Sequence, residues 1–367
     1  MSGVPDVAVV GAGIVGLSTA YSLLERGAAV RVYESGKPGN GQSGGEGRIF
    51  RHAHDDPRLV RFAIHSRAVW REWQERLGVE LVSADGVVAL GPPVERRLPV
   101  LDEVSGVRAR AIEPAEVAEW LPLLAGYSGP AMLDEDGGAI RTSAAIEALA
   151  GAVGDGLVTD EVIAIRPTRN GRVEVQAGGS RSVYSRVVVC AGRGTPRLAR
   201  GVGLSLPVRP AAHVRCTFSV RGEPPARLAC LQDGSGDFGE TGTYATPTPG
   251  NGRYSVGLSQ TVEVQGDGSL FDPGGLAALG DRAAAYVARA LPGLDPEPLE
   301  YRHCWVTELP WGPDGVAVWE ADAVLLVAGH NLFTPAPALG RGLAAAALSE
   351  GLADDLRPEA ELGRAAS

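Results

Sequence analysis

Apolar residues form a strand-helix-strand pattern at the start of the chain. Residues 6–10 are β-branched and apolar, as in a buried parallel strand, and lead directly into the glycine-rich segment 11–16. Apolar positions then recur at helical spacing over residues 17–24, and a second apolar run, 29–33, ends at Glu34. The pattern predicts a complete βαβ unit whose first turn is rich in glycine.

The glycine-rich turn has the spacing of a dinucleotide-binding site. Of Gly11, Gly13 and Gly16, the first permits a tight turn, the second lets the backbone approach a pyrophosphate, and the third lets helix and strand pack closely. The helix N-terminus offers N–H donors and a positive dipole to the phosphates. Glu34 is placed to bind an adenosine ribose, and its charge would repel a 2′-phosphate, which favours FAD or NAD over NADP. The alternative is a glycine-rich turn that binds nothing.

A second kind of pattern occupies the middle of the chain. After a loose, glycine-heavy segment at 36–47, a long amphipathic helix is expected over about residues 60–77. Near the end, residues 323–327 predict a buried strand, and 340–342 are expected to open an alanine-rich helix. Three β-rich runs are typical of a mostly antiparallel sheet with one exposed face: 86–91, 207–220 and 254–264.

These patterns predict an α/β fold in two parts, a Rossmann-like dinucleotide-binding domain and a mostly antiparallel substrate domain. Because pockets favour domain interfaces, the active site is expected between them. The binding domain is expected to be discontinuous, at residues 1–85, 138–205 and 320–367, and the substrate domain to take up 86–137 and 206–319.

Composition narrows the classes of function. The chain has 367 residues, with 34 Lys and Arg against 44 Asp and Glu, and this net charge of -10 argues against nucleic-acid binding. Its four cysteines include no CxxC pair, so neither a disulfide framework nor a structural metal site is expected. The apolar stretch at 7–24 is broken by glycines and lacks a preceding basic segment, which argues against a signal peptide or membrane helix. We therefore expect a cytoplasmic protein, a monomer or small homo-oligomer, with a small-molecule substrate.

The first hundred residues resemble a known family. The GxGxxG turn, the acid at Glu34, the glycine-rich loop and the block Arg48-Ile49-Phe50-Arg51-His52 are similar to those of the D-amino-acid-oxidase superfamily of FAD enzymes, in the branch of sarcosine, N-methyltryptophan and glycine oxidases. Further segments at 137–141, 187–192 and 328–330 extend the resemblance over nearly the whole chain. The resemblance implies FAD as cofactor.

The resemblance also implies roles for individual residues. Arg51 matches the family arginine that pairs with the substrate carboxylate, and Arg48 matches the neighbouring arginine that lies against the flavin. Tyr244 matches an active-site tyrosine that contacts the substrate. His330 joins them as a candidate catalytic residue. Cys304 matches the cysteine bonded to the flavin, although free cysteines are more often small buried hydrophobes. The expected cofactor-binding residues are Gly11, Gly13, Ile14, Val15, Gly16, Glu34, Ser35, Ser43, Arg48, Val162, Ala191, Gly192, Cys304, Gly329, Gly340 and Gly342.

Three positions depart from the family pattern. The oxygen-activating lysine falls on Ser255, the active-site histidine on Ser259, and a second carboxylate-binding lysine on Ala336. Arg48 or a protonated His330 would have to supply the missing positive charge. The apolar surroundings of Ala336 are Phe333, Pro335 and Pro337.

These departures predict a substrate that is larger and less polar than sarcosine. We expect an FAD-dependent amine oxidase that acts on an N-substituted glycine with a bulky apolar N-substituent. It would yield an imine that is hydrolysed to glyoxylate and a primary amine, with O2 reduced to H2O2. The alternatives are an oxidase of sarcosine or N-methyl amino acids that releases formaldehyde, and a flavin dehydrogenase with another electron acceptor.

Overall fold

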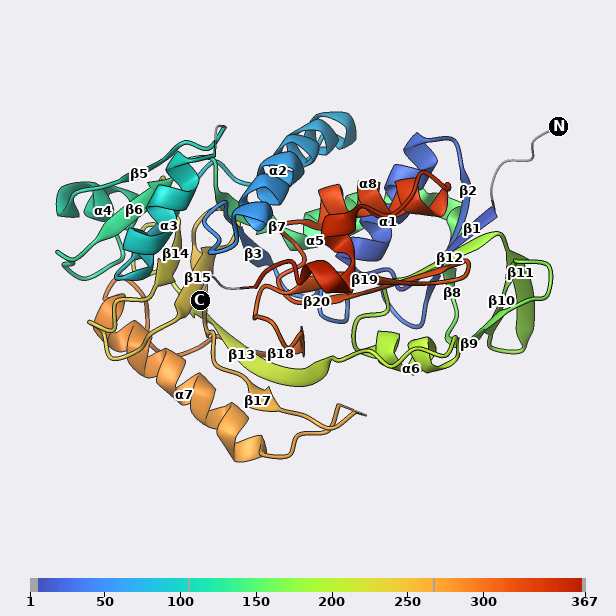
Figure 1. Ribbon diagram of the computed structural model, residues 1–367. Coiled ribbons are helices and arrows are strands. Elements are labelled where there is room, and N and C mark those ends of the chain that lie inside the picture. The colour runs from blue at the N-terminus through green and yellow to red at the C-terminus, as the bar shows by residue number, and fades with distance from the viewer. Residues whose placement is uncertain (1–5, 105, 267, 365–367) are drawn as a thin grey trace.

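Two large sheets, one mainly parallel and one mainly antiparallel, organise the structure (Figure 1). This computed structural model describes residues 6–104, 106–266 and 268–364. Within them the first sheet has six strands in the order β19-β20-β12-β1-β2-β8, parallel except for the β19-β20 pair. Its strands are β1 (Asp6–Val10), β2 (Ala29–Glu34), β8 (Leu157–Thr159), β12 (Arg186–Val189), β19 (Val316–Ala321) and β20 (Val324–Gly329).

Both faces of the six-stranded sheet are covered by apolar side chains. Val7 and Val9 of β1 pack toward the helices α1 (Ile14–Glu25), α5 (Thr142–Val153) and α8 (Ala336–Ala347). Ala8 and Val10 pack toward a three-stranded sheet of β9 (Val162–Pro167), β10 (Val173–Ala177) and β11 (Ser180–Tyr184), and toward α6 (Thr195–Arg200). Successive strand residues point to opposite faces, so a strand that is apolar throughout is buried on both. The predicted βαβ unit is confirmed over β1, α1 and β2.

The second sheet has nine strands in the part of the chain that the structure describes. Its order is β17-β13-β16-β15-β14-β4-β6-β5, with β18 also paired to β13, and only the β14-β4 pair is parallel. The strands are β4 (Val87–Leu90), β5 (Ala109–Ala111), β6 (Ala131–Asp134), β13 (Arg209–Ser219), β14 (Cys230–Asp233), β15 (Thr243–Pro247), β16 (Arg253–Leu258), β17 (Val262–Glu263) and β18 (Glu300–Glu308). The predicted antiparallel sheet is thereby confirmed.

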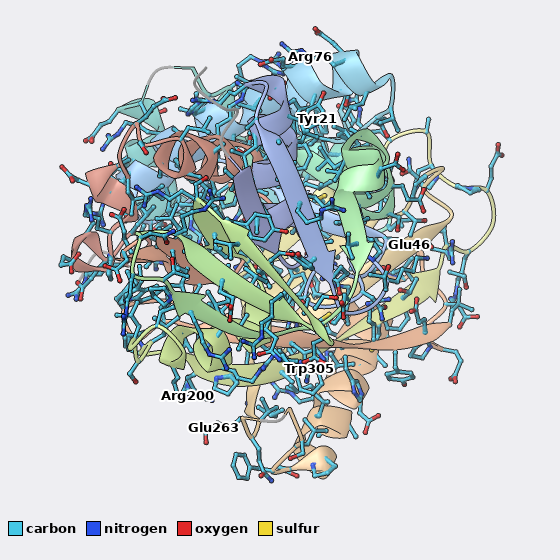
Figure 2. The ribbon with its side chains drawn as sticks, turned by 90° about the vertical axis from the view of Figure 1, so that its right-hand side faces the viewer. Tyr21, Glu46, Arg76, Arg200, Glu263 and Trp305 are labelled. Atoms are coloured by element: carbon cyan, nitrogen blue, oxygen red, sulfur yellow. The ribbon has the colours of Figure 1, made fainter. Side chains whose placement is uncertain are left out.

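Helix α7 (Pro273–Ala290) covers one face of this second sheet. Val214 and Cys216 of β13 and Tyr254 of β16 belong to the apolar cluster beneath that helix. The alternate residues of β13, His213 and Arg215, therefore point to the opposite face. In Figure 2, Trp305 of β18 lies low in the molecule, whereas Tyr21 of α1 lies near its top.

The remaining elements connect the two sheets. Strands β3 (Gly47–Phe50) and β7 (Gly138–Arg141) form a two-stranded sheet. The other helices are α2 (Pro57–Leu77), α3 (Pro93–Asp102) and α4 (Pro114–Trp120), with short 3-10 turns at Gly154–Gly156, Gly192–Gly194, Asp354–Leu356 and Pro358–Ala360. Strand β19 crosses the predicted domain boundary at residue 320, and its pairing joins it to the six-stranded sheet. The division into two discontinuous domains otherwise stays a prediction.

One predicted helix start is wrong. Helix α8 begins at Ala336, so Gly340 and Gly342 lie inside it and do not open it. Pro337 sits in its first turn, where a residue without an N–H costs no hydrogen bond. Among the described residues, no helix is both long and apolar enough to cross a membrane, and no three His, Cys, Asp or Glu side chains are grouped to hold a metal ion.

Candidate active site

A cavity of about 980 Å³ lies between the glycine-rich turn and the polar face of the nine-stranded sheet. The carboxyl ends of parallel strands are where open α/β sheets bind ligands, and β1, β2 and β12 all end here. Most of the predicted site residues line it: Gly11, Gly13, Ile14, Val15, Glu34, Ser35, Ser43, Arg48, Arg51, Val162, Ala191, Gly192, Tyr244, Cys304, Gly329 and His330.

The backbone of the glycine-rich turn is shaped to receive a ligand closely. Gly11 has φ +101°, and a Cβ there would lie 2.5 Å from the Cys190 carbonyl oxygen. A Cβ at Gly13 would meet only the Ser43 hydroxyl, at 3.1 Å, at the mouth of the cavity. The N–H of Ile14 at the start of α1 points to the same place and donates to Ser43 Oγ (2.9 Å). This cradle of small residues and N–H donors fits a pyrophosphate.

Glu34 occupies the end of β2, as the βαβ pattern predicts. Its carboxylate accepts hydrogen bonds from the N–H groups of Ala12 (2.8 Å) and Gly36 (3.0 Å). It is thereby held beside the glycine-rich turn, facing the cavity. Together, the cradle, the helix N-terminus and this carboxylate fit the adenosine diphosphate part of FAD.

Three of the predicted cofactor residues do not line the cavity: Gly16, Gly340 and Gly342. A Cβ at Gly16 would lie 1.9 Å from the Gly11 carbonyl oxygen, and one at Gly340 would lie 2.6 Å from the backbone of Ser18. Gly16 and Gly340 therefore let α1 pack against the turn before it and against α8. Gly342 is a helix residue near Leu356. The structure therefore gives these three glycines a packing role, which for Gly16 follows from the motif, and their predicted cofactor contact stays a prediction.

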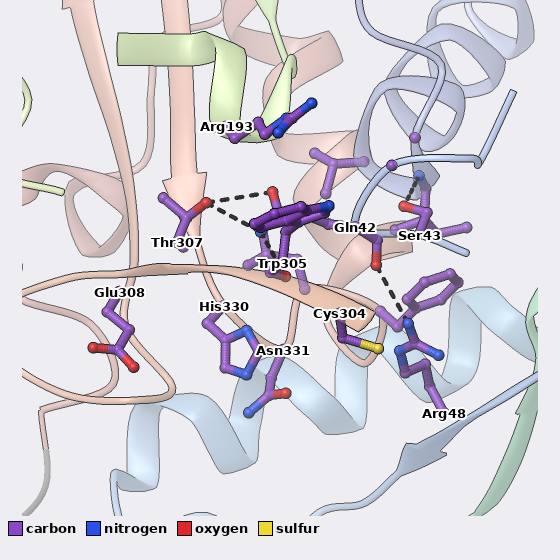
Figure 3. A pocket seen from close by; sticks show the side chains of 18 of the residues that line it. Gln42, Ser43, Arg48, Arg193, Cys304, Trp305, Thr307, Glu308, His330 and Asn331 are labelled. Carbon is purple, nitrogen blue, oxygen red and sulfur yellow. Dashed lines mark hydrogen bonds between the residues drawn. The ribbon is translucent and has the colours of Figure 1, made fainter. Parts of the chain in front are cut away.

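Cys304 and Arg48 approach each other inside the cavity. Figure 3 shows the Cys304 sulfur pointing toward the Arg48 side chain. Cys304 is 6% exposed, and the cysteines at 190, 216, 230 and 304 are all free. Burial and the neighbouring charge of Arg215 lower the pKa of Arg48 to about 9. The Arg48 guanidinium also lies 5.6 Å from the centre of the Phe333 ring.

Arg51 has an internal counter-ion that the sequence did not predict. Its guanidinium donates to Asp314 Oδ2 (2.6 Å), and Asp314 also accepts from His54 Nδ1 (3.1 Å) and Asn331 Nδ2 (2.7 Å). Burial alone would raise the pKa of Asp314, but the charge of Arg51 and the bond from His54 hold it well below its usual value. Arg51 thus has a carboxylate partner within the chain, and its role as the anchor of the substrate carboxylate stays a prediction.

Tyr244 and two histidines form a neutral polar group. The Tyr244 hydroxyl lies 2.8 Å from His213 Nδ1, and the rings of His213 and His330 meet edge to face at 6.2 Å. Burial lowers the pKa of His330 to about 4 and that of His213 well below its usual value. Both are uncharged near pH 7, so the expected compensation by a protonated His330 is not available.

Sequence reasoning missed Arg215, which lies in the cavity and is 5% exposed. It lies on β13 beside the position of the missing lysine, because Thr217 of the same strand pairs with Ser255 and bonds to it (2.9 Å). The sequence does carry a signal for this position: from His213 to Ser219, polar residues alternate with apolar ones, which indicates a strand with one polar face.

The other two departures from the family pattern fall in different environments. Ser259 lines the cavity and donates to the Gly242 carbonyl (2.6 Å). Ala336 is fully buried and does not line it. The apolar wall from this segment is made by Leu332 and Phe333.

The site and fold together define a flavin-dependent oxidoreductase. The sequence profile of the FAD dependent oxidoreductase (DAO) family matches residues 6–346, and the chain belongs to this family, with FAD as its cofactor. This confirms the family resemblance and the fold class.

Named relatives agree with this assignment, and solved structures agree with the fold. The chain is 28% identical over 352 residues to glycine oxidase of Geobacillus kaustophilus (strain HTA426), covering 89% of this chain and 87% of the relative. It is 24% identical over 217 residues to monomeric sarcosine oxidase of Arthrobacter sp. (strain TE1826), covering 56% of each. Among solved structures, NikD, described as an unusual amino acid oxidase essential for nikkomycin biosynthesis, has a TM-score of 0.82 at 20% identity, over 98% of this chain and 97% of NikD. Glycine oxidase from Geobacillus kaustophilus has a TM-score of 0.76 at 23% identity, over 96% of each chain.

Proposed function

We propose that the protein oxidises the C–N bond of a secondary-amine amino acid, and that its substrate is an N-substituted glycine with a bulky apolar N-substituent. R–NH–CH2–COO⁻, O2 and water give R–NH2, glyoxylate and H2O2, by way of an imine that water hydrolyses. Bound FAD supplies the two-electron acceptor. The similarity to proteins named glycine oxidase and monomeric sarcosine oxidase supports the amine class.

The observation that carries the substrate choice is the apolar wall of the cavity. Its members are Ile49 of β3 and the adjacent Leu332 and Phe333 after β20, which come from two segments far apart in the sequence. Such a wall removes a phenyl or branched alkyl group from water, at about 25 cal/mol for each Å² buried. A methyl group, as in sarcosine, would leave most of that wall without contacts.

The polar residues near the wall orient the amine and do not remove its proton. With His213 and His330 uncharged, the cavity favours a substrate amine that is itself neutral, whose nitrogen lone pair is free. The Tyr244 hydroxyl, held by His213, is placed to hydrogen-bond a substrate. We therefore assign no general base, and the residues contribute position and a dry environment.

A panel of amines tests the substrate class. The purified flavoprotein is expected to oxidise N-benzylglycine with a kcat/KM at least tenfold above that for sarcosine, and to release glyoxylate. Formaldehyde from N-methyl amino acids, without turnover of larger N-alkylglycines, would contradict the proposal. Anaerobic bleaching of the flavin that is reversed slowly by air but quickly by an artificial acceptor would replace the oxidase with a dehydrogenase.

We further propose that Cys304 holds FAD covalently through its sulfur. The support is the position of its thiol in the cavity, beside Arg48. After acid precipitation, the yellow colour is expected to stay with the protein pellet, and to move to the supernatant in Cys304→Ala. The matched control is Cys190→Ala, which removes the other thiol that lines the cavity and is expected to keep the colour in the pellet. Colour in the supernatant of the parent protein would mean a dissociable cofactor.

A further inference from the structure

Two arginines of the cavity have no carboxylate partner within 4.0 Å among the described residues, in contrast to Arg51. Arg48 donates to the carbonyl oxygens of Gly47 (3.0 Å), Gln42 (3.3 Å) and Gly44 (2.6 Å). Arg215 donates to Gly47 O (2.6 Å), and its buried Nε has no hydrogen-bond partner. These carbonyl groups offset part of each charge and supply no negative charge.

The two guanidinium groups converge on one loop, since the Nη1 atoms of both donate to the Gly47 carbonyl oxygen. A Cβ on Gly45 would lie 2.9 Å from Arg48 Nη1 and 3.5 Å from Arg215 Nη1. The nearby Arg302 reaches the same loop and is itself paired only weakly, with Glu300 at 4.0 Å. Holding two positive charges this close, one of them on the buried Arg215, is costly unless an anion lies between or beside them. Because the described residues place no carboxylate beside the pair, the arrangement favours an anion supplied by a ligand.

The surroundings of the pair restrict the chemistry of the anion. Arg48 lies against Phe333 of the apolar wall. A ligand whose anionic group binds Arg48 would therefore place its neighbouring atoms against an apolar surface, which favours a ligand with an apolar group next to its charge. Arg215 lies 5.7 Å from the centre of the Tyr244 ring. In cross-strand register, Arg215 is opposite Gly257, and Gly257 is opposite Tyr244. The absence of a side chain at Gly257 leaves room for the Tyr244 ring, because a Cβ there would lie 2.5 Å from the phenol oxygen. Charge, phenol and apolar wall thus share one side of the cavity.

We propose that Arg215, together with Arg48, binds the carboxylate of the substrate, and that Arg51 does not. A guanidinium fork with a free Nε–H matches a carboxylate in geometry and charge. Arg51 is held by Asp314, so a substrate carboxylate there would have to compete with the carboxylate of a partly buried ion pair. This inference rests on the proposed function, since it assigns one group of that substrate, and it makes Arg215 a binding and specificity residue.

The test measures ligand binding to the flavin-loaded protein, with the change in flavin absorbance as the readout. The probe is 3-phenylpropionate, which has the carboxylate and the apolar group but no oxidisable amine, and its neutral counterpart is 3-phenylpropanol. Arg215→Met is expected to raise the Kd of 3-phenylpropionate at least about 30-fold and to leave that of 3-phenylpropanol within about twofold. Arg215→Lys, which keeps the charge, is expected to recover part of the loss and guards against a folding failure of Arg215→Met.

Two control variants separate the arginines. Arg253→Met removes an arginine of the neighbouring strand that is exposed and paired with Glu46, and it is expected to change neither Kd. The double variant Arg51→Gln/Asp314→Asn removes both charges of the ion pair and is expected to change the Kd of 3-phenylpropionate less than about threefold. A large loss in the double variant with none in Arg215→Met would overturn the inference.

The outcome can be separated from that of the proposed function. If N-benzylglycine is oxidised but Arg215→Met and Arg215→Lys bind 3-phenylpropionate as the parent does, the substrate stands and the carboxylate assignment is wrong. If no amine is oxidised, yet Arg215→Met loses 3-phenylpropionate and not 3-phenylpropanol, the anion site stands and the proposed reaction is wrong.

Discussion

The two large sheets contribute to the cavity in different ways. The six-stranded sheet is apolar on both faces, and it offers chemistry only where its strands end, through the backbone of Gly11 and Gly13 and the start of α1. The nine-stranded sheet is apolar only toward α7, and its other face presents side chains such as Arg215 and Tyr244. One sheet binds with its edge and backbone, the other with its face and side chains.

This difference shows which changes each half of the site tolerates. A site made from backbone groups depends on the space around them, so it excludes an added Cβ and requires glycine at the closest positions. A site made from side chains on a sheet face can be rebuilt by exchanging residues on neighbouring strands. Arg215 offers a cation on the strand that pairs with Ser255, two residues from its partner Thr217, as such an exchange would require.

The largest effect on stability is expected in the glycine-rich turn at the edge of the six-stranded sheet. Gly16→Ala would place a methyl group 1.9 Å from the Gly11 carbonyl oxygen, and neither backbone can move without opening the first βαβ turn. We expect a loss of more than about 4 kcal/mol in the free energy of unfolding and little soluble flavoprotein. Denaturant unfolding and flavin content measure this.

Two further glycine variants make this prediction specific. Gly13→Ala meets only a side-chain hydroxyl, so the protein is expected to fold but to lose bound FAD. Gly151→Ala, on α5 with nothing within 4 Å, is expected to stabilise the protein by up to about 1 kcal/mol and keep the flavin. Equal behaviour of all three variants would show that backbone space does not control this edge.

A smaller effect is expected where the two halves meet, at the Arg51-Asp314 pair. Asp314→Asn removes the counter-ion of a partly buried arginine and is expected to lower the free energy of unfolding by about 2 kcal/mol at pH 7. The exposed pair of Arg253 and Glu46 is the control, and Glu46→Gln is expected to cost less than about 1 kcal/mol.

The pH dependence of unfolding identifies the origin of this loss. The pKa of Asp314 is depressed in the folded protein, so its stabilisation is complete above its ordinary value near 3.8 and is lost as the pH falls below that value. The gap between parent and Asp314→Asn should therefore narrow below about pH 4. The histidines 54, 213 and 330, whose folded pKa values are lowered, reduce the stability of both proteins as the pH falls below about 6.5. A gap that does not change with pH would rule out ionic stabilisation by Asp314.

The sequence predicts the edge of the first sheet far better than the face of the second. Glycine spacing and a terminal acid are local patterns, so the cradle and Glu34 follow from neighbours in the chain. The environments of Arg51 and Arg215 depend on partners far away in the sequence, Asp314 for one and Gly47 for the other. A family resemblance transfers residue types at matched positions, and it does not show a new partner such as Asp314. Likewise, the start of α8 at Ala336 was missed because Pro335 and Pro337 look like helix breakers but are tolerated in a first turn.

The smallest effect compares the two faces of the nine-stranded sheet through one tyrosine on each, the buried Tyr254 and the partly buried Tyr244. Tyr254→Phe removes a hydrogen bond to the Ala229 carbonyl (2.7 Å) on the apolar face, and Tyr244→Phe removes the contact with His213 on the cavity face. Each is expected to lower the free energy of unfolding by about 1 kcal/mol, the usual worth of one neutral hydrogen bond. Only Tyr244→Phe should also raise the KM for the amine substrate, by about three- to tenfold, because its hydroxyl alone faces the cavity. If Tyr254→Phe shifts KM as much as Tyr244→Phe does, the apolar face would contribute to binding, and the separation between the two faces would be wrong.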